Sequence, residues 1–128
     1  MKAILDTHAF LWWITKDDRL SQLANEFIGN ANNELLLSAA SSWEIVIKTQ
    51  LGKLELAQPP AEFLRKHVAI NQIQSLPITL DHTLQMYSLP LHHRDPFDRI
   101  LIAQSQLEDA PLITADPLMH QYSLQIIW

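Results

Sequence analysis

Four acidic side chains occupy positions from which they could act together on one ion. Asp6 and Asp116 each follow a short apolar run that predicts a buried strand. Glu44 and Asp98 each fall in the first turn of a predicted helix. Parallel strands end at one edge of their sheet, and the helices that follow them begin there. We therefore expect all four carboxylates to meet at one sheet edge.

Such a gathering of acids predicts a site for a divalent cation. Carboxylates that are brought together raise one another's pKa, and a metal ion is the usual compensation. The chain contains no cysteine, and a site built from oxygen ligands favours Mg²⁺ or Mn²⁺ over zinc. Ions held in this way activate water for the hydrolysis of phosphate esters.

The charge balance of the chain fits this interpretation. Nine Lys and Arg against fourteen Asp and Glu give a net charge of -5. A protein that only grips phosphate backbones is usually basic, so simple nucleic-acid binding is disfavoured. Setting the four acids aside leaves ten acids against nine bases. The rest of the surface is then almost neutral, and charge does not exclude a nucleic-acid substrate.

Each acid also has an ordinary structural explanation. Ser41-x-x-Glu44 has the spacing of a capping box, and Asp95-x-x-Asp98 resembles one, with Pro96 at the first helical position. By position, Asp95 is the better helix cap and Asp98 the better metal ligand. The acids at the strand ends could likewise cap a helix or form a turn. A structural role for all four at once is disfavoured, because all four map to one edge.

The elements that must position these acids alternate along the chain. Short apolar strands are predicted at Lys2–Leu5, Glu34–Ser38, Ser75–Ile78, Leu112–Thr114 and Leu124–Trp128. Helices are predicted at Thr7–Ile14, Gln22–Gly29, from a cap at Ser41 or Ser42 to near Gly52, at Ala61–Ala69, Thr79–Tyr87 and Asp95–Leu107. This alternation predicts the α/β class, with a parallel sheet covered by helices on both faces.

Length and composition favour one domain spanning residues 1–128, because 128 residues with 48% hydrophobic side chains suffice for one core. The absence of cysteine excludes disulfides, thiolate metal sites and thiol catalysis. No apolar run approaches the roughly 18 residues of a membrane span, and no cationic leader is evident. The expectation is therefore a cytoplasmic protein with no membrane contact.

Other side chains offer weaker hypotheses. His8 with His92 or His93 could serve a metal-independent ribonuclease, which would remain active in excess EDTA. A histidine beside apolar residues is more often packed or solvated. Arg94 and Arg99 flank the predicted site and could hold a phosphate, although a surface role is equally open.

A receiver-like signalling module is a non-catalytic alternative, in which an acid at a strand end accepts a phosphoryl group on Mg²⁺. Receivers usually present an acidic pair after the first strand and a lysine after the last one. Here Asp6 stands alone and Trp128 ends the chain, so this alternative is disfavoured.

Four short motifs, in this order, resemble those of the PIN-domain toxins of the VapC type: Leu5-Asp6-Thr7-His8, Ser42-Trp43-Glu44-Ile45, His93-Arg94-Asp95-Pro96-Phe97-Asp98-Arg99 and Ile113-Thr114-Ala115-Asp116. The resemblance implies a Mg²⁺- or Mn²⁺-dependent ribonuclease, the toxin of a toxin-antitoxin pair. It also implies a three-layer α/β/α sandwich around a parallel sheet of about five strands, a homodimer, and inhibition by a VapB-like antitoxin. A PIN fold that has lost catalysis, and only binds its antitoxin, is the alternative.

The resemblance also implies roles for individual residues. The family's acidic quartet corresponds to Asp6, Glu44, Asp98 and Asp116, as catalytic residues and metal ligands that activate water against RNA. Thr114 matches the family's small hydroxyl residue, and Thr7, Asp95 and Arg99 are expected in supporting positions. The Asp116-Pro117 step departs from the pattern, because proline restricts the backbone of the residue before it.

Overall fold

The sheet at the centre of the fold is parallel throughout. In the computed structural model, which describes residues 1–128, five strands lie in the order β3-β2-β1-β4-β5. They are β1 (Lys2–Leu5), β2 (Glu34–Ser38), β3 (Gln74–Leu76), β4 (Leu112–Ile113) and β5 (Ile126–Ile127). The predicted α/β class, with a parallel sheet of about five strands, is confirmed.

Helices connect the strands as parallel pairing requires. They are α1 (Thr7–Thr15), α2 (Gln22–Gly29), α3 (Ala39–Gln50), α4 (Pro60–Ile70), α5 (Leu80–Gln85) and α6 (Pro96–Leu107), with short 3-10 helices η1 (Met86–Ser88) and η2 (Pro117–Gln121). None of them combines the length and the apolarity that crossing a membrane requires.

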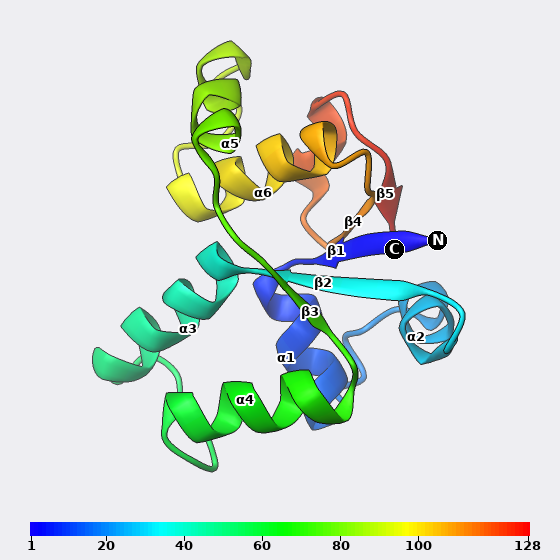
Figure 1. Cartoon of the computed structure of the whole chain (residues 1–128), viewed down its shortest axis with the longest axis vertical. Helices are drawn as coiled ribbons and strands as arrows, with labels where there is room; N and C mark the ends of the chain where they lie inside the picture. The colour runs from blue at the N-terminus through cyan, green and yellow to red at the C-terminus, as the bar shows by residue number, and fades with distance from the viewer.

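The sheet separates two hydrophobic cores. On β1, Leu5 packs in one core with Phe10 of α1, whereas Ile4 packs in the other core with Leu101 and Ile102 of α6. Successive side chains of a strand point to opposite faces, so β1 must be apolar at every buried position. Figure 1 shows α1, α3 and α4 on one side of the sheet and α5 and α6 on the other. The three-layer sandwich is thereby confirmed.

Several helices begin where the sequence predicts. Thr79 caps α5 through a complete capping box with His82, and Pro60 occupies the first turn of α4. Asp95 caps α6, with Pro96 in its first turn. These starts follow from local side-chain chemistry, and no distant contact is needed to set them.

The start of α3 is different from the prediction. The predicted cap at Ser41 or Ser42 is wrong, because Ser38 at the end of β2 accepts the hydrogen bond of the Ala40 amide. Strand and helix therefore join without a loop, and Glu44 lies in the second turn of α3. The Ser41 hydroxyl is buried without a hydrogen-bond partner.

Three predicted strands are also longer than the observed ones or shifted from them. β3 covers Gln74–Leu76 where Ser75–Ile78 was expected, and Pro77 follows it directly. A proline has no amide hydrogen for the ladder, so pairing stops there. β4 and β5 pair over two residues each, from Leu112 opposite Ile126 to Ile113 opposite Ile127.

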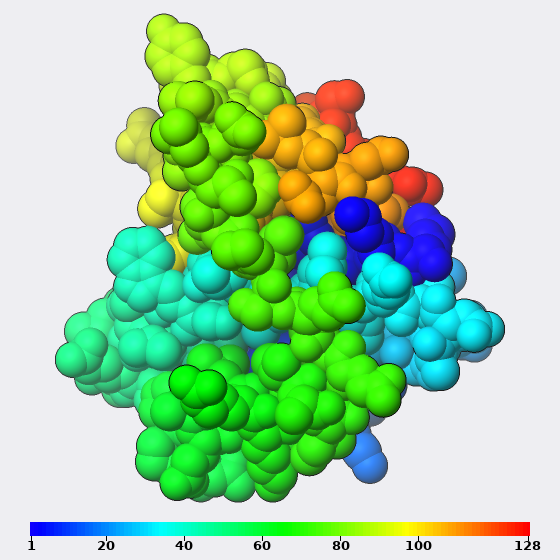
Figure 2. Space-filling view, in the orientation of Figure 1, coloured from blue at the N-terminus to red at the C-terminus, as the bar shows by residue number.

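One edge of the sheet and one helical segment are conspicuous on the surface. β3 is an edge strand, and Figure 2 shows the green chain that leads from it towards α5 lying across the face in view. The α5 and η1 segment projects from the body at the top of Figures 1 and 2. Tyr87 in η1 is 97% exposed.

Replacement of Phe10 tests how much the core beneath α1 contributes to stability. Its side chain is completely buried and meets the ring of Phe63 edge-on at 6.5 Å between centroids. We expect Phe10→Ala to lower the free energy of unfolding by about 3–5 kcal/mol, because it removes buried area and leaves a cavity. Urea denaturation measures the loss. Leu23→Ala, at a position 55% exposed on α2, is the control and should change stability by about 0.5 kcal/mol or less. Equal losses in both variants would contradict this account of the core.

Candidate active site

The four acids come from four different elements and line one crevice. Asp6 follows β1 and Asp116 follows β4, two neighbouring strands paired from Leu5 to Ile113. Glu44 comes from α3 and Asp98 from the first turn of α6. All four border a crevice of about 320 Å³ at the carboxyl edge of the sheet. The structure therefore brings the four predicted residues together, and their chemical roles remain a prediction.

Asp6 serves both the fold and the crevice. One of its oxygens, Oδ1, accepts a hydrogen bond of 2.7 Å from the Ala9 amide and caps α1. Burial raises the pKa of Asp6, whereas hydrogen bonds from the Thr114 hydroxyl and the Ala9 amide counteract the rise. The neighbouring carboxylate of Glu44 raises the pKa of Asp6 further.

Glu44 is held by two partners instead of by a helix cap. The Thr7 hydroxyl donates to its Oε1 at 2.6 Å, and Lys48 pairs with its Oε2 at 3.1 Å. Lys48 lies one helical turn further along α3, where a salt bridge is expected. The Ser41-x-x-Glu44 capping box is therefore wrong, and Glu44 is free to face the crevice.

The pKa of Asp98 is raised, like that of Asp6. Its pKa rises from 3.8 to about 7, mainly because burial removes water from the carboxylate. Repulsion from Asp95 adds to the rise, and Glu44 and Asp116 contribute smaller repulsions. Attraction to His93 acts in the opposite direction and lowers the pKa. Asp95 occupies the cap of α6, where its Oδ1 accepts from the Phe97 amide at 2.8 Å. Because Asp95 provides the cap, the Asp98 side chain is left to line the crevice, as the sequence predicts.

Asp116 is restrained on both of its oxygens. Its Oδ1 accepts from the Leu118 amide at 2.9 Å and caps η2, and its Oδ2 lies 3.0 Å from Nε2 of His93. Its own amide donates to the Thr114 hydroxyl at 3.1 Å. The turn expected at Asp116-Pro117 is the start of η2, and Asp116 still lines the crevice.

The sequence assigns His93 no place among the site residues and offers it as an acid-base alternative. The structure places His93, Asp98 and Asp116 with ligand atoms within 4.8 Å of one another. The signal available in the sequence is the position of His93 two residues before the cap of α6. Both ring nitrogens of His93 already have partners, Asp116 and Tyr122, which disfavours a free acid-base pair with His8.

The expectation that Arg99 could hold a phosphate at this site is wrong. The Arg99 side chain is buried, and its guanidinium donates to the backbone carbonyls of Pro90 at 2.8 Å and Met86 at 3.1 Å. A guanidinium can satisfy several carbonyls at once, so Arg99 fixes the segment that leads into α6. Its role is structural support behind the site.

The donor set of the crevice fits a divalent cation. Five carboxylates border it, whereas Lys48 is the only Lys or Arg and is already paired with Glu44. The pKa values of Asp6 and Asp98 are raised because both carboxyl groups are shielded from water and lie near other carboxylates. Hard oxygen ligands of this kind favour ions such as Mg²⁺ and Mn²⁺.

Comparisons with known proteins agree with this geometry. The model of a family described as "PIN domain" matches residues 3–123. Ribonuclease VapC22 of Mycobacterium tuberculosis is 28% identical over 114 residues, which cover 88% of this chain and 85% of that protein.

Solved structures show the same fold. VapBC2 from Rickettsia felis, bound to a DNA fragment from its promoter, superposes with a TM-score of 0.72 at 14% identity, over 98% of this chain and 97% of that chain. VapBC-1 from nontypeable Haemophilus influenzae superposes with a TM-score of 0.66 at 17% identity, over 98% of this chain and 96% of that chain.

The pKa of Asp98 predicts how cation binding depends on pH. A cation binds the ionised carboxylate, so affinity for Mn²⁺ should fall by about tenfold per pH unit below about 7. The folded pKa of Asp98 lies above its unfolded value, so the folded state holds its proton more tightly than the unfolded state does. The free energy of unfolding of the ion-free protein should therefore fall as the pH rises from 3.8 to about 7, whereas a salt-bridged acid has the opposite effect. Calorimetric titration in buffers of different ionisation enthalpy measures affinity and proton release together. Affinity that is flat across this range, or equal pH dependence in Asp98→Asn, would contradict the assignment.

Proposed function

The chain belongs to the PIN domain family, since the family model matches residues 3–123, and from this premise we propose that it is a VapC-type ribonuclease, the toxin of a toxin-antitoxin pair. The observation that carries the proposal is the crevice in which Asp6, Glu44, Asp98 and Asp116 meet. The mycobacterial relative, which matches most of the chain, is named a ribonuclease, and this supports the same activity here. Residues 1–128 act as one nuclease domain in this proposal.

Mg²⁺ or Mn²⁺ is the proposed cofactor, held by Asp6, Glu44, Asp98 and Asp116. A divalent cation bound there supplies a Lewis acid, which makes water a stronger nucleophile and offsets charge on the phosphate. Asp6 and Asp116 stand at the ends of paired strands and are the proposed direct ligands. Glu44 and Asp98 act partly through water, which Mg²⁺ tends to retain.

The remaining side chains orient these acids. Thr7 and Lys48 each take one oxygen of Glu44, which fixes the rotamer of a long side chain. Thr114 stands between Asp6 and Asp116, with its hydroxyl accepting from the Asp116 amide. Asp95 keeps the first turn of α6 in place, so that Asp98 enters the crevice. Such pre-positioning reduces the ordering that catalysis would otherwise require.

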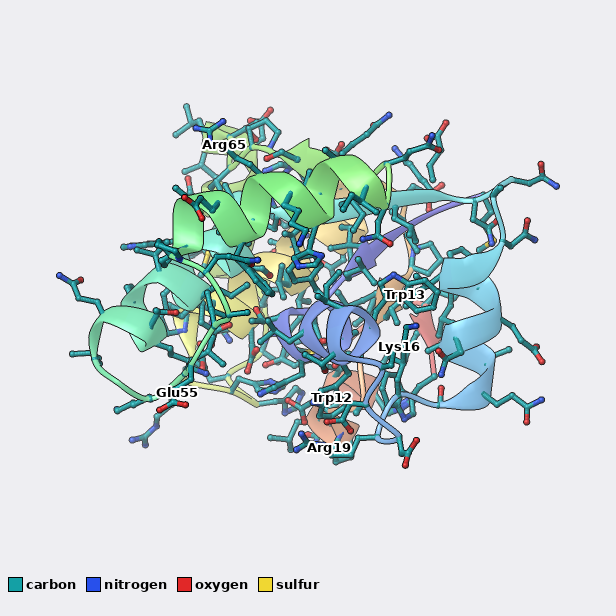
Figure 3. The ribbon with its side chains drawn as sticks, turned by 90° about the horizontal axis from the view of Figure 1, so that it is seen from below. Trp12, Trp13, Lys16, Arg19, Glu55 and Arg65 are labelled. Carbon is teal, nitrogen blue, oxygen red and sulfur yellow. The ribbon has the colours of Figure 1, made fainter.

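A groove beside the crevice supports a polyanionic substrate such as RNA. The groove, of about 750 Å³, shares Thr7, His8, Trp12 and Lys48 with the crevice, and Lys53, Lys66 and Arg19 also line it. Arg19 lies over the ring of Trp12, 4.9 Å from its centroid, and Figure 3 shows the two side by side. Cations with a nearby aromatic ring suit single-stranded RNA, whose phosphates pair with Lys and Arg and whose bases stack.

The proposed partners are a VapB-like antitoxin and a second copy of the chain. Similar folds occur in complexes named VapBC, which supports an antitoxin here. The projecting α5 and η1 segment leaves Leu80, Leu84 and Tyr87 exposed at 72%, 62% and 97%, which supports a homodimer contact. The cytoplasm is the proposed location of the activity.

Asp6→Asn tests the metal centre. We expect it to lower ribonuclease activity with Mn²⁺ by more than about 100-fold. Loss of a residue that only hydrogen-bonds to a metal ligand lowers activity by about 10–100-fold, and loss of a ligand itself should cost more. Stability should hold, because asparagine also caps helices and can accept from the Ala9 amide. Cleavage of a fluorescent RNA pool measures the rate, and Asp18→Asn, an exposed acid outside the crevice, is the control. Full activity in Asp6→Asn, or wild-type cleavage in excess EDTA, would contradict the proposal.

The ends of the RNA products test the nucleophile. Attack by water leaves a 5′-phosphate on one product and a 3′-hydroxyl on the other. Attack by the ribose 2′-hydroxyl would leave a 2′,3′-cyclic phosphate. Mass spectrometry of the fragments distinguishes the two, and we expect only 5′-phosphate ends. Cyclic phosphate ends would overturn the proposed hydrolysis by water.

A further inference from the structure

His93 lies behind the acidic crevice and not on its wall. Its side chain is 5% exposed, whereas that of its partner Asp116 is 31% exposed. The crevice is bordered by Asp116 and Asp98, but His93 is not among the residues that line it. The imidazole therefore reaches the crevice through Asp116.

Tyr122 holds the imidazole from the other side. The Tyr122 hydroxyl accepts from the His93 amide at 3.0 Å and lies 3.1 Å from Nδ1 of the same residue. The two rings are stacked, with 5.4 Å between centroids and 28° between planes. Backbone, ring face and ring nitrogen of His93 are all restrained by one side chain.

These partners assign the tautomer. An ionised Asp116 only accepts hydrogen bonds, so Nε2 of His93 carries the proton that it donates. When the ring carries only this proton, Nδ1 is an acceptor, which suits the hydroxyl proton of Tyr122. The resulting chain runs from Tyr122 through His93 to Oδ2 of Asp116, with each donor matched to an acceptor.

The same chain connects the two halves of the crevice. His93 precedes α6, which carries Asp98, whereas Asp116 and Tyr122 flank η2 after β4. Nothing in local sequence joins these segments, because 23 residues separate His93 from Asp116. The hydrogen bond therefore links the segment before α6 to the segment after β4.

We propose that His93, oriented by Tyr122, is a positioning residue that aims Asp116 at the cation of the proposed nuclease centre and sets its distance from Asp98. The inference rests on the proposed function and adds a residue that acts through a ligand. A direct ligand role is disfavoured, since His93 is shielded from the crevice by Asp116. Hydrogen-bond partners of metal ligands orient them in this way, and losing one costs about 10–100-fold in metal affinity or activity.

Mn²⁺ binding to the full chain, measured by calorimetry, tests the role without relying on turnover. We expect His93→Ala to weaken binding by about 10–100-fold. His93→Gln should recover most of the loss, because its amide can donate to Asp116, and Tyr122→Phe should lose less than His93→Ala. His120→Ala is the matched control, since His120 is an exposed histidine of η2. We expect it to bind Mn²⁺ as the wild type does.

A double-mutant cycle separates positioning from a general structural role. If His93 acts through Asp116, His93→Ala should cost little further affinity in an Asp116→Asn background. Additive losses, or equal binding by His93→Ala and wild type, would overturn the proposal.

Electron spin-echo spectra of bound Mn²⁺ should lack a directly coordinated nitrogen, and a nitrogen coupling that disappears in His93→Gln would make His93 a ligand instead. If the wild type binds no Mn²⁺, the proposed metal centre is wrong. If the wild type and His93→Ala bind Mn²⁺ equally well, only the role of His93 is wrong.

Discussion

Repulsion among carboxylates is the constraint that the site must satisfy. Asp6, Glu44, Asp98 and Asp116 border one crevice, and burial together with repulsion from neighbouring carboxylates raises the pKa of Asp6 and of Asp98 there. A divalent cation reverses this cost, because it converts the repulsion into several attractive contacts. The unfavourable charge of the ion-free crevice is therefore the property on which the proposed cation site depends.

The fold restrains the acids to different degrees. Asp6 and Asp116 each cap a helical segment, and Glu44 is held by a hydroxyl and a lysine. The side chain of Asp98 accepts no hydrogen bond, and burial with neighbouring negative charge raises its pKa to about 7. Hydrogen bonds to an ionised carboxylate lower its pKa, so their absence leaves the rise at Asp98 unopposed by donors. In the proposed metal centre, the ionisation of Asp98 is consequently coupled to the binding of a cation.

What the sequence reveals depends on the range of the interaction. Alternating apolar strands and helices predict the parallel sheet, and sheet topology then places Asp6 and Asp116 at one edge. The start of α3 is mispredicted although β2 ends where expected, because Ser38 and Ser41 are equally good caps in local chemistry. The roles of Arg99 and His93 escape prediction since their partners are loop carbonyls or distant side chains. Contacts of this kind are made by the folded chain and have no periodic signature.

The presence of one cation site is tested most directly by the anomalous X-ray scattering of crystals soaked in Mn²⁺. The account predicts a Mn²⁺ peak in the crevice at the carboxyl ends of β1 and β4, with oxygens of Asp6 and Asp116 at about 2.0–2.2 Å, as expected for small octahedral ions. It also predicts that the peak is lost in crystals of Asp6→Asn. A crevice without Mn²⁺ in soaked crystals, with the four carboxylates turned towards other partners, would contradict the account.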